Sequence, residues 1–198
     1  GEFESKICSI LGETCSLAGD ILLLQARTGA IGTALLPIPV FARDKLSLVT
    51  LAPDGSGDIF ATTTNDLVLG DDTFINTGAG EDEVRLKTTG SIAVETIVTL
   101  NDALSLEAGD NVEVRNGSTL RSATLNVLAQ SIHTNQTGEL QTLVGDMLLH
   151  ATDGPIGLRF TPPLPDGTDL QPVNVQVAGR LSLVTDAPGG AAGDISVS

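Results

Sequence analysis

Apolar and polar residues alternate in short runs along most of this chain. Because successive side chains of a β-strand point to opposite faces, each run predicts a half-buried strand. No capped segment shows the i, i+3, i+4, i+7 spacing of an amphipathic helix, which argues against helical crossovers between strands. The pattern therefore predicts an all-β protein, with strands at residues 46–50, 66–69, 83–86, 91–94, 103–106, 112–114, 125–127, 173–177 and 195–197.

Similar strands return at intervals of mostly about 20 residues, which is the length of one coil in a parallel β-helix. They lie near Leu46, Leu67, Leu86, Leu104, Leu125, Met147, Val173 and Leu181. In such a solenoid, aliphatic side chains stack inside while glycine and polar residues turn the corners. Antiparallel β-sandwich or jelly-roll modules would give the same alternation and stay open as the alternative fold.

The two ends of the chain are related in sequence. Three phrases near the N-terminus return in the same order near the C-terminus, so residues 17 to about 60 correspond to residues 143–198. Recurrence of whole segments is typical of modular or solenoid proteins. The paired phrases are 19–23 with 145–149, 28–32 with 153–157, and 45–50 with 180–185; the second copy is longer between Gly157 and Arg180, an insertion that a solenoid can hold as a loop.

The composition points to an aliphatic core. Of 198 residues, 41% are hydrophobic but only 3% are aromatic, and both Trp and Tyr are absent. Immunoglobulin-like sandwiches usually rely on a buried Trp or a tyrosine corner, so the composition favours the stacked solenoid. The same absence removes the aromatic platforms that polysaccharide-cleaving β-helix enzymes commonly offer to sugar rings.

The charge balance is strongly acidic. Ten basic and 25 acidic residues give a formal net charge of −15. Nucleic acid and anionic membrane surfaces would be repelled, and no apolar stretch is long enough for a membrane span. We therefore expect neither nucleic-acid binding nor membrane insertion.

The Gly-Asp-Ile, Thr-Gly-Ala-Ile-Gly and Leu-Ser-Leu-Val-Thr phrases of residues 17–198 resemble the long repetitive exoproteins of bacteria related to filamentous haemagglutinin. The resemblance implies a right-handed β-helical shaft within a large secreted or surface-anchored protein used for adhesion or cell–cell contact. Partners would be a surface protein or glycan of a host or neighbouring cell, and the solenoid ends could self-associate. The resemblance assigns no individual residue a function.

A second resemblance lies in the middle of the chain. Residues 78–84 fit G-x-G-x-D-x-U, most of the calcium-binding nonapeptide of β-roll proteins, and residues 70–74 fit half of a preceding copy. The resemblance implies a calcium-binding module with Asp72 and Asp82 as carboxylate ligands. Alternatively, glycine and aspartate occur here because they turn corners. No cofactor other than calcium is predicted.

Catalytic motifs are missing from the sequence. His133 and His150 are the only histidines, and neither has metal-ligand spacing with Cys or a second His. Neither a Gly-x-Ser-x-Gly elbow nor a P-loop occurs. We expect no catalytic residues and no enzymatic activity; a polysaccharide-acting β-helix enzyme is kept as an alternative by fold analogy alone.

Two regions are expected along the chain. Residues 1–16 begin with a Gly-Glu-Phe that is typical of a cloning remnant and contain Cys8 and Cys15, whereas residues 17–198 form the solenoid domain. The two cysteines could close a small disulfide loop in an oxidising compartment or remain thiols.

Overall fold

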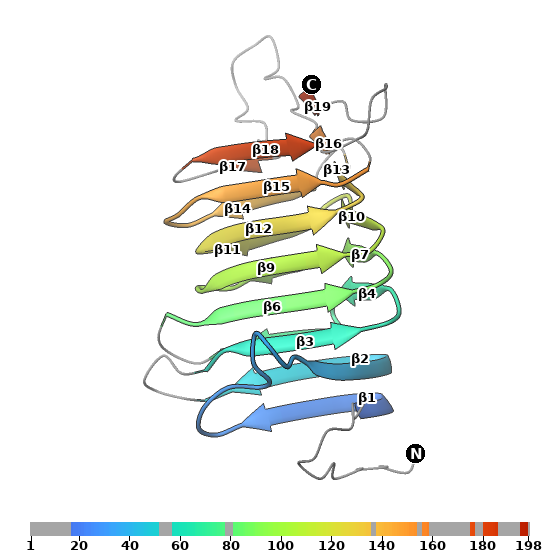
Figure 1. The fold of residues 1–198 in the computed structure, drawn as a ribbon, viewed down its shortest axis with the longest axis vertical. Helices are drawn as coiled ribbons and strands as arrows, with labels where there is room; N and C mark the ends of the chain where they lie inside the picture. Colours follow the sequence, from blue (N-terminus) through green and yellow to red (C-terminus); the bar gives the residue numbers. More distant parts are fainter. Residues whose placement is uncertain are drawn as a thin grey trace.

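The computed structural model describes residues 17–51, 57–77, 81–135, 138–153, 156–158, 175–176, 180–185 and 195–197. These residues form only strands and turns, stacked as a β-solenoid of about six turns (Figure 1). The part of the chain so described contains no helix that is long and apolar enough to cross a membrane. Cys8, Cys15 and the predicted insertion around residues 161–167 lie outside the described residues.

Three parallel sheets make up the solenoid. The long sheet follows the order β1-β2-β3-β6-β9-β12-β15-β18, with β5 paired to β2. Its strands are β1 (Leu17–Ala26), β2 (Ile38–Thr50), β3 (Ile59–Thr63), β5 (Thr73–Asn76), β6 (Glu83–Thr88), β9 (Ala103–Ala108), β12 (Thr124–Ala129), β15 (Met147–Ala151) and β18 (Leu181–Thr185).

The other two sheets run beside it. The six-stranded sheet holds β4 (Leu67–Leu69), β7 (Ile92–Val94), β10 (Asn111–Val114), β13 (Ser131–Thr134), β16 (Ile156–Leu158) and β19 (Ile195–Val197). The four-stranded sheet holds β8 (Ile97–Thr99), β11 (Thr119–Ser122), β14 (Glu139–Thr142) and β17 (Val175–Gln176). All pairings between these described strands are parallel, so the predicted parallel β-helix is confirmed over the antiparallel alternative.

The handedness can be followed in Figure 1. The strands β3, β6, β9, β12, β15 and β18 run from left to right on the near side, and after each of them the chain passes behind while it rises towards the C-terminus. This path makes the solenoid right-handed, as expected for parallel strands joined by crossovers.

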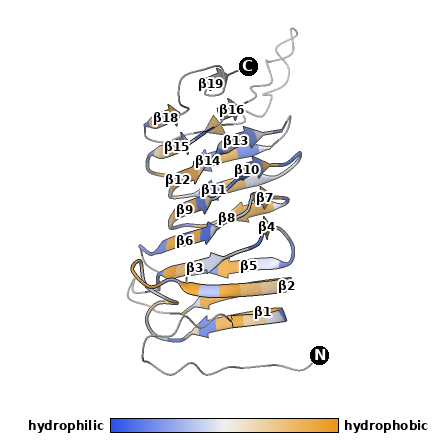
Figure 2. Ribbon diagram, turned by 45° about the vertical axis from the view of Figure 1, so that its right-hand side comes forward, coloured by the Kyte–Doolittle hydropathy of each residue, from blue (hydrophilic) through white to orange (hydrophobic). Residues whose placement is uncertain are grey.

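The core is a set of aliphatic columns along the solenoid axis. Val84, Leu104, Leu125 and Met147 are Cα partners on successive strands, and all are buried. In-register pairing places each inward side chain over the one below, so alternation in sequence becomes a column in space. Figure 2 shows hydrophobic and hydrophilic residues alternating along these strands.

The coil length agrees with the predicted interval only in the middle of the chain. The distance in sequence between paired residues gives the length of each coil. It is 25 residues from Ile59 to Val84, and then 20, 21 and 22 residues for the three coils that lead to Met147. The next coil takes 34 residues, from Met147 to Leu181.

Two of the predicted coil positions are wrong. Leu67 lies in β4 of the six-stranded sheet, and Leu46 pairs with Thr73 instead of joining the column of Leu86. Every coil contains several strands with the same alternation, so spacing alone does not tell which sheet a strand joins. Val173 lies outside the described residues.

The two related ends form the same two-coil arrangement. In the first copy Leu22 pairs with Leu46 and Ile31 bridges to Ile59. In the second copy Met147 pairs with Leu181 and Ile156 with Ile195. Each copy therefore supplies two successive coils whose equivalent strands stack on each other.

A bulge distinguishes the first copy from the second. Gly19 and Ile21 of β1 pair with Ala42 and Lys45 of β2, so one residue of β1 lies opposite two residues of β2 and the extra residue belongs to β2. As a result Ile21 is 57% exposed, whereas the residue aligned with it in sequence, Met147, is fully buried. Leu22 instead packs against the core, so the shift exchanges inward and outward faces.

Candidate functional site

One coil changes neighbours partway along its path. Its strand β4 pairs with β7 in the next coil, but β5, which follows after the turn at residues 70–72, pairs with β2 in the previous coil. As a result β4 does not pair with β2, and β5 does not pair with β8, so the stack of coils is open at these two places. Among the described residues, this break in the stack is the best candidate for a functional site.

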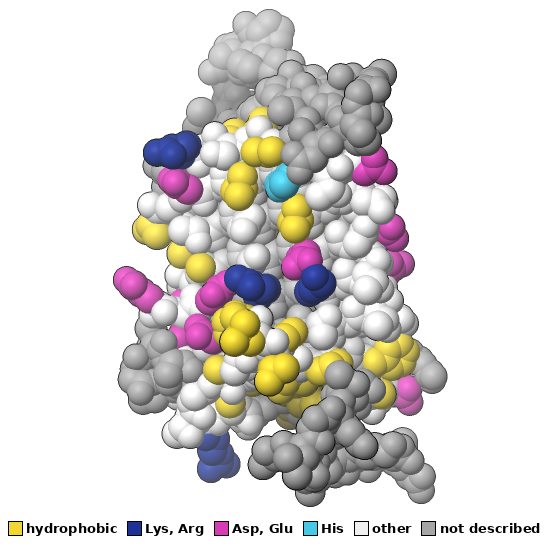
Figure 3. All heavy atoms as spheres, viewed as in Figure 1, with side chains coloured by type: hydrophobic (Ala, Val, Ile, Leu, Met, Phe, Trp, Pro, Cys, Tyr) yellow, Lys and Arg dark blue, Asp and Glu magenta, His cyan; other side chains and the backbone are white. Residues whose placement is uncertain are grey.

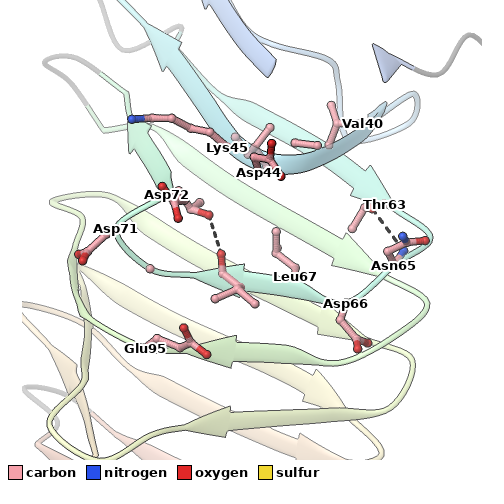
Figure 4. Close-up of a pocket in the computed structure, with 15 residues that line it drawn as sticks. Val40, Asp44, Lys45, Thr63, Asn65, Asp66, Leu67, Asp71, Asp72 and Glu95 are labelled. Atoms are coloured by element: carbon pink, nitrogen blue, oxygen red, sulfur yellow. Dashed lines mark hydrogen bonds between the residues drawn. The ribbon is translucent and has the colours of Figure 1, made fainter. Parts of the chain in front are cut away.

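The opening between β2 and β4 holds a cavity of about 310 Å³ (Figure 4). Its wall combines side chains of β2 with the edge of β4 and the turn that follows it. The lining residues are Val40, Ala42, Asp44, Lys45, Leu46, Thr63, Asn65, Asp66, Leu67, Val68, Gly70, Asp71, Asp72, Thr73 and Glu95.

The cavity exists because β2 passes from one neighbour to another. Ile38 and Pro39 pair with β3, whereas residues 46–49 pair with β5. The residues between them run past β4 without pairing to it. The backbone edge of β4 is thus turned to the cavity, where the Thr73 hydroxyl donates a 2.5 Å hydrogen bond to the Val68 carbonyl.

Among the described residues of the cavity wall, five carry carboxylates and Lys45 is the only cationic side chain. Two of the acidic groups have partners: Asp66 Oδ1 accepts a hydrogen bond from the Ser91 N–H at 2.8 Å, and Glu95 forms an ion pair with Arg115. The acidic lining is Asp44, Asp66, Asp71, Asp72 and Glu95. Such a wall favours cationic or hydrogen-bond-donating groups.

The structure places the two predicted calcium ligands at different corners. Asp72 precedes β5, is exposed and lines the cavity, whereas Asp82 precedes β6 and is buried. Asp82 Oδ1 accepts a 2.8 Å hydrogen bond from the Gly57 N–H. Within the described residues, no group of three acidic or histidine side chains is arranged to hold a metal ion. Residues 78–80 of the nonapeptide lie outside the described residues, and calcium binding stays a prediction.

Aspartates at strand starts share a structural role that the sequence reasoning missed. Each uses Oδ1 to accept a backbone N–H from a neighbouring coil, which satisfies donors at the corners. The pairs are Asp58 with Glu83, Asp66 with Ser91, Asp82 with Gly57, Asp102 with Asp82, and Asp146 with Arg180. The signal in the sequence was the aspartate that immediately precedes these strands, and it supports the corner-turning interpretation of the Gly-Asp pairs.

One corner also buries a threonine and a carboxylate. Asp102, 5% exposed, accepts a hydrogen bond from the Thr77 hydroxyl on one carboxylate oxygen, and its other oxygen accepts the Asp82 N–H at 3.3 Å. Thr77 is itself 3% exposed. These contacts tie together three successive coils, so Asp102 and Thr77 belong to the frame of the solenoid.

The histidines lie on strands. His133 is on β13, where its Nε2 is 2.9 Å from Ser131 Oγ, and that hydroxyl donates to Asn111 Oδ1 at 2.6 Å. With the hydroxyl proton directed to Asn111, the ring N–H donates to Ser131, the reverse of the arrangement that activates a serine nucleophile. His150 lies on β15 and is not among the described residues that line the cavity.

Comparison with known proteins adds no functional assignment to this geometry. No protein-family model, curated protein or solved structure shows significant similarity to the chain.

Proposed function

We propose that this chain is a structural, adhesive segment of a large bacterial surface or secreted repeat protein that mediates cell–cell or cell–surface contact. The observation that carries the proposal is the stack of parallel coils, in which the related ends of the chain form the same two-coil unit. Units that pair mainly with their neighbours can be repeated into a long rigid shaft. The partner is a protein or glycan on the surface of a host or neighbouring cell.

A loop on the N-terminal coils supplies a contact point for such a role. Ile31 and Ile38 both pair with β3, at Ile59 and Ala61, so the residues between them leave the sheet and return to it. The loop is closed by Thr33, whose N–H and C=O exchange 3.1 Å hydrogen bonds with Leu36.

This loop presents apolar side chains to solvent. Leu35 is 92% exposed and Leu36 is 78% exposed, the highest values among the large hydrophobic residues described. Figure 3 shows hydrophobic side chains gathered over the N-terminal coils, with charged residues of both signs next to them. Exposed apolar groups held on a rigid frame favour contact with another surface.

Bead adhesion tests the proposal. Beads carrying the full chain are mixed with bacterial and epithelial cells, and we expect them to bind more than albumin-coated beads do, with free chain as competitor. L35S/L36S should reduce binding, whereas V144S, which also removes an exposed apolar side chain, should not. Binding equal to that of albumin beads on every cell type would contradict the adhesive role. The predicted calcium-binding and polysaccharide-cleaving roles are not favoured by a specific observation in the described residues.

A further inference from the structure

The second opening of the stack is a groove between β5 and β8. Figure 2 shows β5 at the level of β3 and β8 one turn above it. β5 pairs with β2, and β8 lies at the end of the four-stranded sheet, so the two strands do not pair with each other. A cavity of about 280 Å³ separates them, lined by Leu69, Gly70, Asp71, Thr73, Phe74, Ile75, Thr96, Ile97, Val98, Thr99 and Leu100.

The β8 wall of the groove is a strand edge with open hydrogen-bonding positions. On its other side β8 pairs with β11. There the Leu100 N–H donates to the Arg121 carbonyl, and the Thr96 carbonyl accepts a hydrogen bond from the Thr119 N–H. In a parallel ladder, alternate residues turn their N–H and C=O to opposite sides. The backbone groups of Ile97 and Thr99 therefore point into the groove.

β5 also turns a strand edge with backbone N–H and C=O groups towards the groove. Leu46 of β2 donates its N–H to the Asp72 carbonyl, and the register continues with Leu46 opposite Thr73 and Leu48 opposite Ile75. The same alternation then turns the N–H and C=O of Ile75 away from β2 and into the groove. Two parallel strand edges thus face each other, and none of the described strands lies between them.

The side chains around the groove continue the two faces of the solenoid. Ile75 and Val98 pack against the core, and Leu100 is buried. On the outer side Phe74 is 52% exposed and Ile97 is 72% exposed. A strand placed in the groove would bury the side chains of one face among Ile75, Val98 and Leu100. The side chains of its other face would cover Phe74 and Ile97.

We propose that this groove accepts one extended strand of a partner polypeptide, which runs parallel to β5 and β8 and hydrogen-bonds to both edges. Its inward position carries an aliphatic residue that completes the core column. Strand addition of this kind takes its affinity from main-chain bonds and its specificity from alternate side chains. The groove does not depend on the adhesive role proposed above.

Charge determines which strands fit. Asp71 lines the groove, and Asp71 and Asp72 directly precede β5, so the end of the groove where β5 begins is acidic (Figure 4). Glu95, just before β8, is already ion-paired with Arg115. A parallel strand would place its own N-terminal end there. The favoured partner therefore has lysine or arginine just before its aliphatic position, in agreement with the net charge of −15.

A synthetic peptide, Lys-Lys-Ser-Thr-Leu-Arg-Ser-Ala, tests the proposal. It places two lysines before the sequence of residues 118–123, because β11 already pairs with the other edge of β8 and buries Leu120 in the core. In NMR titrations of the full chain, we expect saturable shifts at the Ile75, Ile97 and Thr99 amides. The same peptide with aspartate in place of leucine should produce none.

Variants of exposed residues make the test specific. I97K and F74K place a charge beside the groove without touching the core, and each should weaken peptide binding about tenfold or more. V144K makes the same kind of change at a 76% exposed residue outside the groove lining and should leave binding unchanged. Absence of shifts, equal binding of the aspartate peptide, or equal binding by I97K would overturn the proposal. Slow exchange of the three groove amides in the free chain would also overturn it, because the edges would then already be paired.

Discussion

The hydroxyl of Thr73 lies 2.5 Å from the carbonyl oxygen of Val68 and donates a hydrogen bond to it. The bond spans the turn between β4, which pairs with β7 of the next coil, and β5, which pairs with β2 of the previous coil. It satisfies a carbonyl at the edge of β4 that does not pair with β2. One side chain therefore stabilises the turn that opens the stack on both sides.

Replacement of Thr73 by valine removes this bond while keeping the shape of the side chain. We expect T73V to lower the free energy of unfolding by about 1 kcal/mol, the usual net contribution of such a bond. T73S keeps the hydroxyl and should retain most of the stability. Urea denaturation of the three proteins measures the difference, and identical midpoints for T73V and the parent chain would show that the bond does not support the turn.

Gly109 marks a corner where neighbouring coils approach closely. A Cβ atom at this position would lie 2.2 Å from the Thr89 carbonyl oxygen, and backbone cannot move aside as a flexible side chain can. We expect G109A to destabilise the chain by about 1–3 kcal/mol.

The matched control for this change is G70A, because a Cβ at Gly70 meets nothing closer than 3.6 Å. G70A should leave the melting temperature unchanged or raise it slightly, since alanine restricts the unfolded chain more than glycine does. Equal melting temperatures for G109A and G70A would contradict the close stacking of these coils.

Stacking of the coils can be trapped by a disulfide. Ser105 and Asn126 are Cα partners on adjacent strands, and a separation of about 4.8 Å lies within the range that a disulfide bridges. With Cys8 and Cys15 replaced by serine, S105C/N126C should crosslink on mild oxidation, as seen by a shift in electrophoretic mobility.

S105C/L148C is the control for the crosslink. Leu148 is the partner of Asn126 on the next strand, so it lies two strands from Ser105 and is out of reach of a disulfide. Crosslinking of this pair in place of S105C/N126C would mean that the register is wrong.

Calcium should stabilise this chain no more than magnesium does. Asp72 and Asp82 lie at different corners, and Asp82 already accepts a backbone hydrogen bond. Melting curves with each ion and with D72N provide the measurement. A rise in melting temperature that is specific to calcium and lost in D72N would restore the β-roll interpretation.

The sequence predicts the repeating part of the fold well. Alternation identified strands such as 83–86, 103–106 and 125–127, and their spacing predicted parallel coils because every coil there has nearly the same length. Local pattern determines these elements, since one face of each strand must be buried.

The break in the stack could not be predicted in the same way. β5 and β8 have similar alternation, but whether β5 pairs with β2 or with β8 depends on long-range register, on the turn at residues 70–72 and on the length of β2. The bulge between β1 and β2 was hidden for the same reason, because an extra residue in β2 between Ala42 and Lys45 leaves the composition of the strands unchanged. Acidic residues near the break suggested calcium, whereas most of the described corner aspartates accept backbone hydrogen bonds.

Amide hydrogen exchange of the free chain, resolved by NMR, tests the broken stack most directly. Leu100 donates its N–H to Arg121 at 2.8 Å, whereas the Thr99 and Ile75 amides point into the groove. We predict slow exchange at Leu100 and at core strands such as β9 and β12, with fast exchange at Thr99 and Ile75. Slow exchange at Thr99 and Ile75, equal to that at Leu100, would mean that the ladder is continuous and would contradict this account.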